Sequence, residues 1–190
     1  MKTSKYRNGE EQTVETYSSI NEDLREIYLI GDISEAMSSA VIPAIRQLDQ
    51  SRGQIDFIVS STGGDVDAGL AMYDAILLAK NKTACYCYGI CQSMAAIIIQ
   101  ACDQRVLAPN CRYMIHNGSI GLDCSLDEGL ALTKEVKLLK EKNLQILGRR
   151  AKIPLAKIKK LCYSTTYMSA EECCLAGFAD LILEIPRKRR

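Results

Sequence analysis

Three short apolar runs, rich in β-branched and aromatic residues, recur at a regular interval in the first half of the chain. They cover residues 27–30, 55–60 and 83–89, so each run begins 28 residues after the previous one. Runs of this length and composition predict strands, and the segments between them place apolar residues at helical spacing. Strands and helices that alternate at this interval are typical of an α/β fold built from β-α-β units.

The spacing of apolar residues predicts a helix in each of the two intervals and further elements after the third strand. The first helix runs roughly from Ser34 to Asp49, and Pro43 in its middle predicts a kink because proline removes a backbone donor. The remaining elements follow in order: a helix from Asp65 to about Lys80, a helix starting at Ser93, and strands at residues 105–107 and 112–116.

A long amphipathic helix is predicted over residues 125–150. Ser125 and Glu128 form a capping box at its start, and Leu132, Val136 and Leu139 begin its apolar stripe. A helix of about 25 residues is longer than the diameter of a small domain. We therefore expect it to project and to bury its stripe against another subunit, with coverage of the sheet as the alternative.

The last part of the chain predicts a short helix over residues 155–163, a second capping box at Ser169 and Glu172, and a strand over residues 179–185. No linker or internal repeat divides the chain. We expect a mobile polar segment at residues 1–25, one domain at residues 26–185 and a basic tail at residues 186–190.

Composition and charge exclude several classes of protein. Hydrophobic residues make up 47% of the 190 residues and charged residues 25%, which is typical of a globular protein. The net charge of +1, with no basic stripe outside the end of the chain, argues against a nucleic-acid partner. No apolar run resembles a signal peptide or reaches membrane-spanning length, so we expect a cytosolic protein that does not enter membranes.

The nine cysteines are an odd number scattered through apolar segments. This distribution favours reduced thiols in the core over a disulfide framework. Cys85, Cys87 and Cys91 lie close together, but their spacing is not that of a known metal site. We therefore expect neither a metal ion nor another cofactor.

Candidate chemistry lies where predicted strands end, because the carboxyl ends of parallel strands share one edge of a sheet. Gly63 and Gly64 follow the second strand and precede a helix, so their backbone N–H groups can face an oxyanion. A purely structural turn is the alternative for this pair.

Ser93 follows the third strand at another junction between strand and helix. Its hydroxyl can project into a cleft as a nucleophile, while the N–H of Met94 donates into the same space. The alternative is that Ser93 only caps the helix, since serine is a preferred N-cap residue.

His116 ends a later strand and is the only histidine in the chain. Histidine is the side chain best suited to act as a general base near neutral pH, although a purely structural histidine is the alternative. A serine, an amide-rich turn and the single histidine on one sheet edge together favour serine acyl-transfer chemistry.

Four segments resemble the proteolytic subunit of the caseinolytic protease, ClpP, in sequence and in order. They are residues 61–64 (Ser-Thr-Gly-Gly), 89–95 (Gly-Ile-Cys-Gln-Ser-Met-Ala), 109–116 (Pro-Asn-Cys-Arg-Tyr-Met-Ile-His) and 167–172 (Tyr-Met-Ser-Ala-Glu-Glu). The resemblance implies a crotonase-like fold and a serine endopeptidase with Ser93 as nucleophile, His116 as base and the amides of Gly64 and Met94 as oxyanion hole. It also implies stacked heptameric rings, a ring-to-ring handle at residues 125–150 and an ATP-dependent unfoldase that feeds unfolded protein into the chamber.

The chain departs from the family pattern at several positions. Thr165 stands where the family has the aspartate of its catalytic triad, and Thr62 replaces a proline of the glycine motif. Asp56 and Ile58 stand where docking tyrosines are common. Two alternatives to an active endopeptidase therefore remain open: a weak or silent ring subunit, and an acyl-CoA enzyme of the crotonase type.

Overall fold

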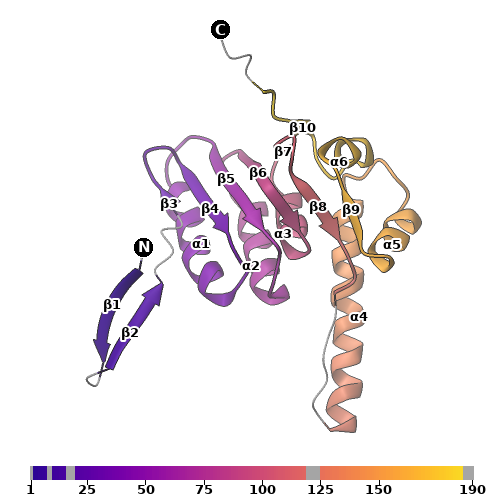
Figure 1. The fold of residues 1–190 in the computed structure, drawn as a ribbon, viewed down its shortest axis with the longest axis horizontal. Helices are drawn as coiled ribbons and strands as arrows, with labels where there is room; N and C mark the ends of the chain where they lie inside the picture. The colour runs from indigo at the N-terminus through magenta and orange to yellow at the C-terminus, as the bar shows by residue number, and fades with distance from the viewer. Residues whose placement is uncertain (1, 8–9, 16–19, 119–124, 186–190) are drawn as a thin grey trace.

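A mixed sheet of eight strands, most of them parallel, forms the centre of the molecule (Figure 1). The computed structural model describes residues 2–7, 10–15, 20–118 and 125–185. Strand order is β10-β7-β6-β5-β4-β3, while β8 pairs with β6 and with β9. The strands are β3 (Ile20–Asn21), β4 (Glu26–Ile30), β5 (Ile55–Ser61), β6 (Thr83–Gln92), β7 (Gln104–Leu107), β8 (Arg112–Ile115), β9 (Thr166–Met168) and β10 (Leu181–Ile182).

The predicted β-α-β arrangement is confirmed, because β4, β5 and β6 pair in parallel and helices connect them. Strand β6 is three residues longer than predicted and changes partner along its length. Its first half pairs with β7, and its last residues, from Ile90 to Gln92, pair with β8. This change of partner aligns the ends of β6 and β8, the two strands that precede Ser93 and His116.

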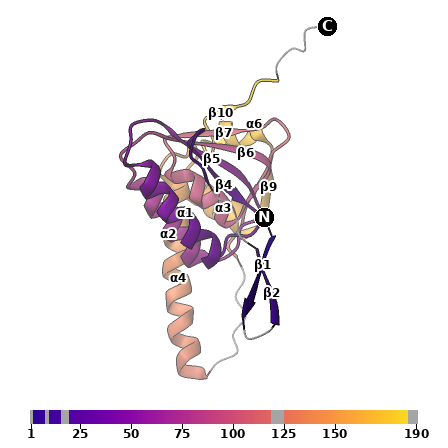
Figure 2. The same cartoon turned by 90° about the vertical axis from the view of Figure 1, so that its left-hand side faces the viewer.

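Three helices cover one face of the sheet, as Figure 2 shows with the sheet seen from its edge. They are α1 (Glu35–Leu48), α2 (Val66–Leu77) and α3 (Met94–Ile98), and α3 continues into a 3₁₀ turn at Ile99–Ala101. Burial alternates along β5, because successive side chains point to opposite faces of the sheet: Phe57 and Val59 are fully buried, while Ile58 is half-buried. Helix α1 runs through Pro43 without interruption.

Two predicted elements are shorter in the structure. Helix α2 ends at Leu77 rather than near Lys80, and the last strand contains only Leu181 and Ile182. The N–H groups of Phe178 and Ala179 donate to the carbonyl of Cys173 and so complete the end of helix α6 (Ala170–Ala176). Those donors are used by a helix end and cannot begin a strand, which is why the prediction from residue 179 was wrong.

The N-terminal segment forms a hairpin of β1 (Lys2–Arg7) and β2 (Glu10–Glu15), and these two strands pair only with each other. Its predicted mobility stays a prediction. The basic tail at residues 186–190 lies outside the described residues.

Helix α4 (Leu126–Gly148) extends beyond the body of the domain, and α5 (Leu155–Tyr163) follows it (Figure 1). The predicted capping box of Ser125 and Glu128 is present at its start. Leu144 and Leu147 in its last turns are buried, whereas Leu130 and Leu138 are exposed. The helix therefore covers the domain only with its last turns and leaves apolar side chains of its projecting part in water. Among the described helices, none combines the length and apolarity needed to cross a bilayer.

A buried ion pair joins β7 to the segment before β10. Arg105, fully buried, donates from Nε and Nη2 to Asp180 at 3.0 and 2.7 Å and also donates to Gln100. Burial by itself raises the pKa of Asp180, but hydrogen bonds and charge from Arg105, together with the charge of Arg150, bring this pKa below its usual value. The carboxylate thus stabilises the folded state.

We expect Asp180→Asn to lower the free energy of unfolding by about 2 kcal/mol at pH 7. Removing one partner of a fully buried ion pair lowers the free energy of unfolding by ~3–5 kcal/mol. The expected loss is smaller here because the Asp180 side chain is 30% exposed. A carboxylate with a lowered pKa stabilises the fold above the pKa of an unfolded aspartate, about 3.9, and loses this effect as the pH falls through its folded-state value. Urea titrations at pH 7 and pH 3 should therefore show a smaller difference between variant and wild type at pH 3.

Lys82→Met is the matched control, because Lys82 pairs with Asp103 while its side chain is 80% exposed. Exposed pairs contribute about 0–1 kcal/mol. An equal loss of stability in the two variants would contradict the role assigned to the buried pair.

Candidate active site

Ser93 occupies a strained turn between β6 and α3. Its φ of 52° and ψ of −119° lie in a region that residues other than glycine rarely adopt. Its N–H donates to the carbonyl of Met114, which holds the turn against β8. Its side chain makes no capping hydrogen bond to α3, so Ser93 does not act as a side-chain N-cap. The strained turn leaves the hydroxyl free for another partner.

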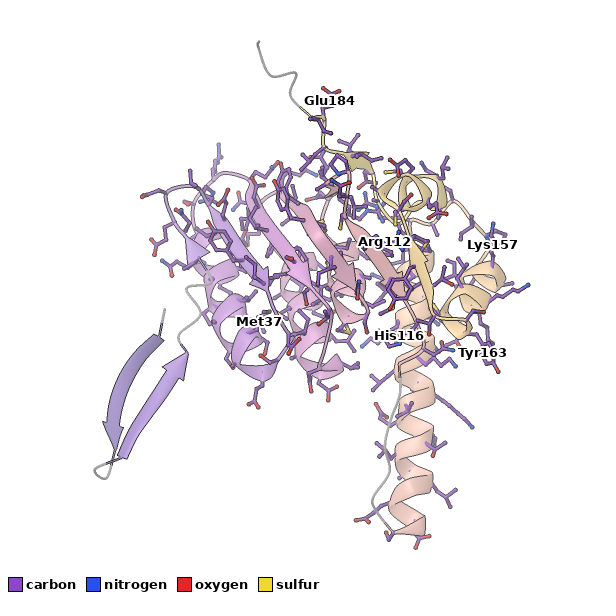
Figure 3. All side chains as sticks on the ribbon, in the orientation of Figure 1. Met37, Arg112, His116, Lys157, Tyr163 and Glu184 are labelled. Carbon is purple, nitrogen blue, oxygen red and sulfur yellow. The ribbon has the colours of Figure 1, made fainter. Side chains whose placement is uncertain are left out.

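That partner is His116, which follows the last residue of β8. The Ser93 Oγ and the His116 Nε2 lie 2.8 Å apart, within hydrogen-bond distance. The two residues are 23 positions apart in the sequence and meet because Gln92 pairs with Met114 in parallel register. Figure 3 labels His116 at the lower end of β8, where the strand approaches helix α4. The predicted serine and histidine are therefore in direct contact.

The predicted oxyanion donors border the same space. Gly64, Met94, Ser93 and His116 all line one cavity. Ile33 N–H donates to the Gly63 carbonyl and the Ile33 carbonyl accepts from Asp65 N–H, so the backbone on both sides of Gly64 is fixed. Within the described residues, neither the Gly64 nor the Met94 N–H has a hydrogen-bond partner. Both amides are thus available to an oxygen placed beside Ser93.

Helix α4 forms the opposite wall of this cavity. Leu144 and Leu147 supply apolar surface, while Lys140 and Asn143 supply polar groups. Neither of these two polar residues was among the predicted site residues. Asn143 lies on the apolar stripe of the helix, four positions after Leu139, and a polar residue on such a stripe is the signal that could have indicated it.

Cys162 also lines the cavity, and burial raises its pKa to about 11 even though the charge of Lys140 acts in the opposite direction. A thiol with this pKa is protonated at neutral pH and is a poor nucleophile. The eight cysteines in the described part of the chain are all free thiols, and seven of them are buried.

Thr165, the position of the family's triad aspartate, directly precedes β9. Strands β8 and β9 pair Ile115 with Thr166 in antiparallel register, so the next step of the register places Thr165 opposite His116. Thr165 has a φ of 48°, an unfavourable conformation for a β-branched residue. Within the described residues, no hydrogen bond to the His116 Nδ1 is present. No described carboxylate therefore orients the imidazole.

Gly63→Ala should abolish the geometry of the site. Gly63 has a φ of 96°, and an added Cβ would lie 2.7 Å from the Ser93 Cβ and 2.8 Å from the Met94 N. We expect loss of Ser93 labelling by a fluorophosphonate, measured as the mass of the intact protein, because the turn must shift to accept the methyl group.

Gly31→Ala is the matched control, since Gly31 has a φ of 93° and an added Cβ there meets no atom within 4 Å. This variant therefore has a similar cost from a positive φ but lacks the contact of the added Cβ with Ser93. If Gly31→Ala impaired labelling as much as Gly63→Ala, the contact with Ser93 would not be the cause.

Comparison with known proteins agrees with the α/β fold. The Clp protease family matches residues 8–186. The chain is also similar to the ATP-dependent Clp protease proteolytic subunit of Deinococcus radiodurans, with 28% identity over 184 residues that cover 95% of this chain and 90% of that protein. The match extends over nearly the whole chain and includes the strands that bring Ser93 to His116, so this chain belongs to the Clp protease family.

Proposed function

We propose that this protein is a serine endopeptidase that hydrolyses peptide bonds inside an oligomeric chamber. The observation that carries the proposal is the 2.8 Å contact between the Ser93 Oγ and the His116 Nε2 at a strained turn. Free N–H groups beside this pair and membership of a protease family support it. Family membership also favours hydrolysis over the acyl-CoA chemistry that the sequence alone left open.

In the proposed mechanism, neutral His116 accepts the proton of the Ser93 hydroxyl through Nε2 while Oγ attacks the carbonyl carbon of the substrate. The N–H groups of Gly64 and Met94 donate to the oxygen that becomes negatively charged. The protonated imidazole then gives its proton to the leaving amine, and water releases the acyl group from Ser93 by the same steps.

The proposed assembly is a pair of stacked rings, with α4 as the contact between them. The exposed Leu130 and Leu138 of the projecting part of α4 support this assignment, because large apolar side chains cost about 1.5–3 kcal/mol each when they remain in water. We further propose a cytoplasmic location and a crotonase-like fold. The relative from Deinococcus radiodurans is named as a subunit of an ATP-dependent protease, so an ATP-driven unfoldase is the proposed partner.

Two measurements test this function. A fluorophosphonate should add its mass to the wild-type protein at Ser93 and leave Ser93→Ala unmodified. Sedimentation at micromolar concentration should give a particle of many subunits, and a stable monomer of 21.0 kDa would contradict the proposed assembly.

A catalytically silent ring subunit is the second candidate. The observation that favours it is the lack of a described partner for the His116 Nδ1 beside Thr165. Such a subunit would form the same particle but would not react with the fluorophosphonate. The labelling experiment therefore separates the two candidates.

A further inference from the structure

An unpaired polar atom lies in the wall of the cavity that contains Ser93. The Asn143 Oδ1 is buried and has no hydrogen-bond partner, and it is the only side-chain atom of this kind in the part of the chain that the structure describes. Buried acceptors are almost always paired, because an unpaired one loses its hydrogen bonds to water and gains none in return. A ligand that brings a donor into the cavity would satisfy Asn143.

Asn143 lines the same cavity as Ser93, His116 and the two proposed oxyanion donors. With the substrate carbonyl oxygen at the Gly64 and Met94 amides, the side chain of the residue that provides this carbonyl must enter the space beside them. That space is lined by apolar Ile97, Leu144 and Leu147 together with Asn143. The side chain that fits has an apolar stem and a polar end.

The charge of Lys140 limits which polar groups the substrate side chain can carry at its end. It lines the same cavity, it is half-buried, and within the described residues it forms no ion pair. A second positive charge beside this ammonium group would be repelled, which disfavours lysine and arginine. An uncharged carboxamide suits both groups, because its NH₂ donates to the Asn143 Oδ1 while its oxygen accepts from Lys140.

We propose that Asn143 is a specificity-determining residue, and that the site prefers substrates with glutamine immediately before the cleaved bond. This inference rests on the proposed peptidase function. Methionine is the comparison residue, since its side chain has similar length and flexibility but no N–H donor. A polar site that is built to pair with a substrate group rejects the analogue without it more strongly than an apolar pocket rejects a wrong shape.

The test compares two peptides that differ only in having glutamine or methionine at this position. We expect the ratio of kcat/KM for the glutamine peptide to that for the methionine peptide to fall at least about tenfold in Asn143→Leu. Cleavage of the methionine peptide should change much less, because leucine keeps the branched shape of the asparagine side chain and removes only its polar atoms. Gln145→Leu, an exposed change two residues further along α4, should leave the ratio unchanged.

Calorimetric binding of the product peptides, which end in glutamine or methionine, keeps this proposal separate from the peptidase function. A glutamine preference that disappears in Asn143→Leu supports the subsite even where no hydrolysis occurs, and in that case the peptidase proposal fails alone. Equal binding of both product peptides, or an unchanged ratio in Asn143→Leu, would overturn the specificity proposal even where Ser93 is fully active.

Discussion

Ser93→Ala is expected to lower kcat for peptide hydrolysis about 100-fold relative to the wild type and to abolish fluorophosphonate labelling. In a complete serine triad, removal of the serine costs about 10⁶-fold in kcat and removal of the aspartate alone about 10⁴-fold, and these losses are not additive. Because no carboxylate in the described residues hydrogen-bonds to His116, we expect most of the 10⁴-fold loss to be present already in the wild type. Removal of Ser93 should therefore cost only the remaining factor of about 100.

Steady-state hydrolysis of a fluorogenic peptide measures this change. Ser164→Ala is a suitable control, since Ser164 is an exposed serine at the end of α5 and is not among the residues that line the cavity. Equal turnover by wild type and Ser93→Ala would refute Ser93 as the nucleophile.

Thr165→Asp should raise kcat at least tenfold, with a ceiling near 10⁴-fold. The register of β8 and β9 places this position opposite His116, where a carboxylate can accept the Nδ1–H bond and stabilise the imidazolium that forms. The change should not harm the fold, because aspartate tolerates a φ of 48° better than threonine. The same peptide assay measures the gain.

Thr165→Asn separates the charge from the backbone effect. Asparagine has the shape of aspartate and also tolerates positive φ, but it carries no charge. We expect little gain from it. In the Thr165→Asp background, Ser93→Ala should cost far more than about 100-fold, because a complete triad then acts as a unit. Fast wild-type turnover with no gain from Thr165→Asp would mean that another group orients His116.

Local features of the fold could be predicted from the sequence because they depend on neighbouring residues. The equal spacing of three apolar runs indicated β4, β5 and β6, and α5 was predicted with its observed bounds. Both capping boxes, at Ser125 and at Ser169, are present in the structure. A capping box joins residues three positions apart, so it can be predicted without knowledge of contacts between distant segments.

The short strands were harder to predict. Strand β9 has three residues and its sequence has no distinct pattern; it exists because Tyr167 and Met168 pair with β8. Strand β10 begins two residues later than predicted, since the N–H groups of Phe178 and Ala179 before it complete the end of α6. Short strands are defined by their partners rather than by their own composition.

For the candidate site, the sequence determined which residue types were available: one histidine in the chain, a serine at a turn and a pair of glycines. It could not decide whether Ser93 caps a helix or approaches a base, since serine suits both roles. The tertiary structure decided this, because the pairing of Gln92 with Met114 brings the Ser93 Oγ within 2.8 Å of His116. Only packing of α4 against the domain placed Asn143 in the same cavity, because contacts between distant segments depend on the whole fold.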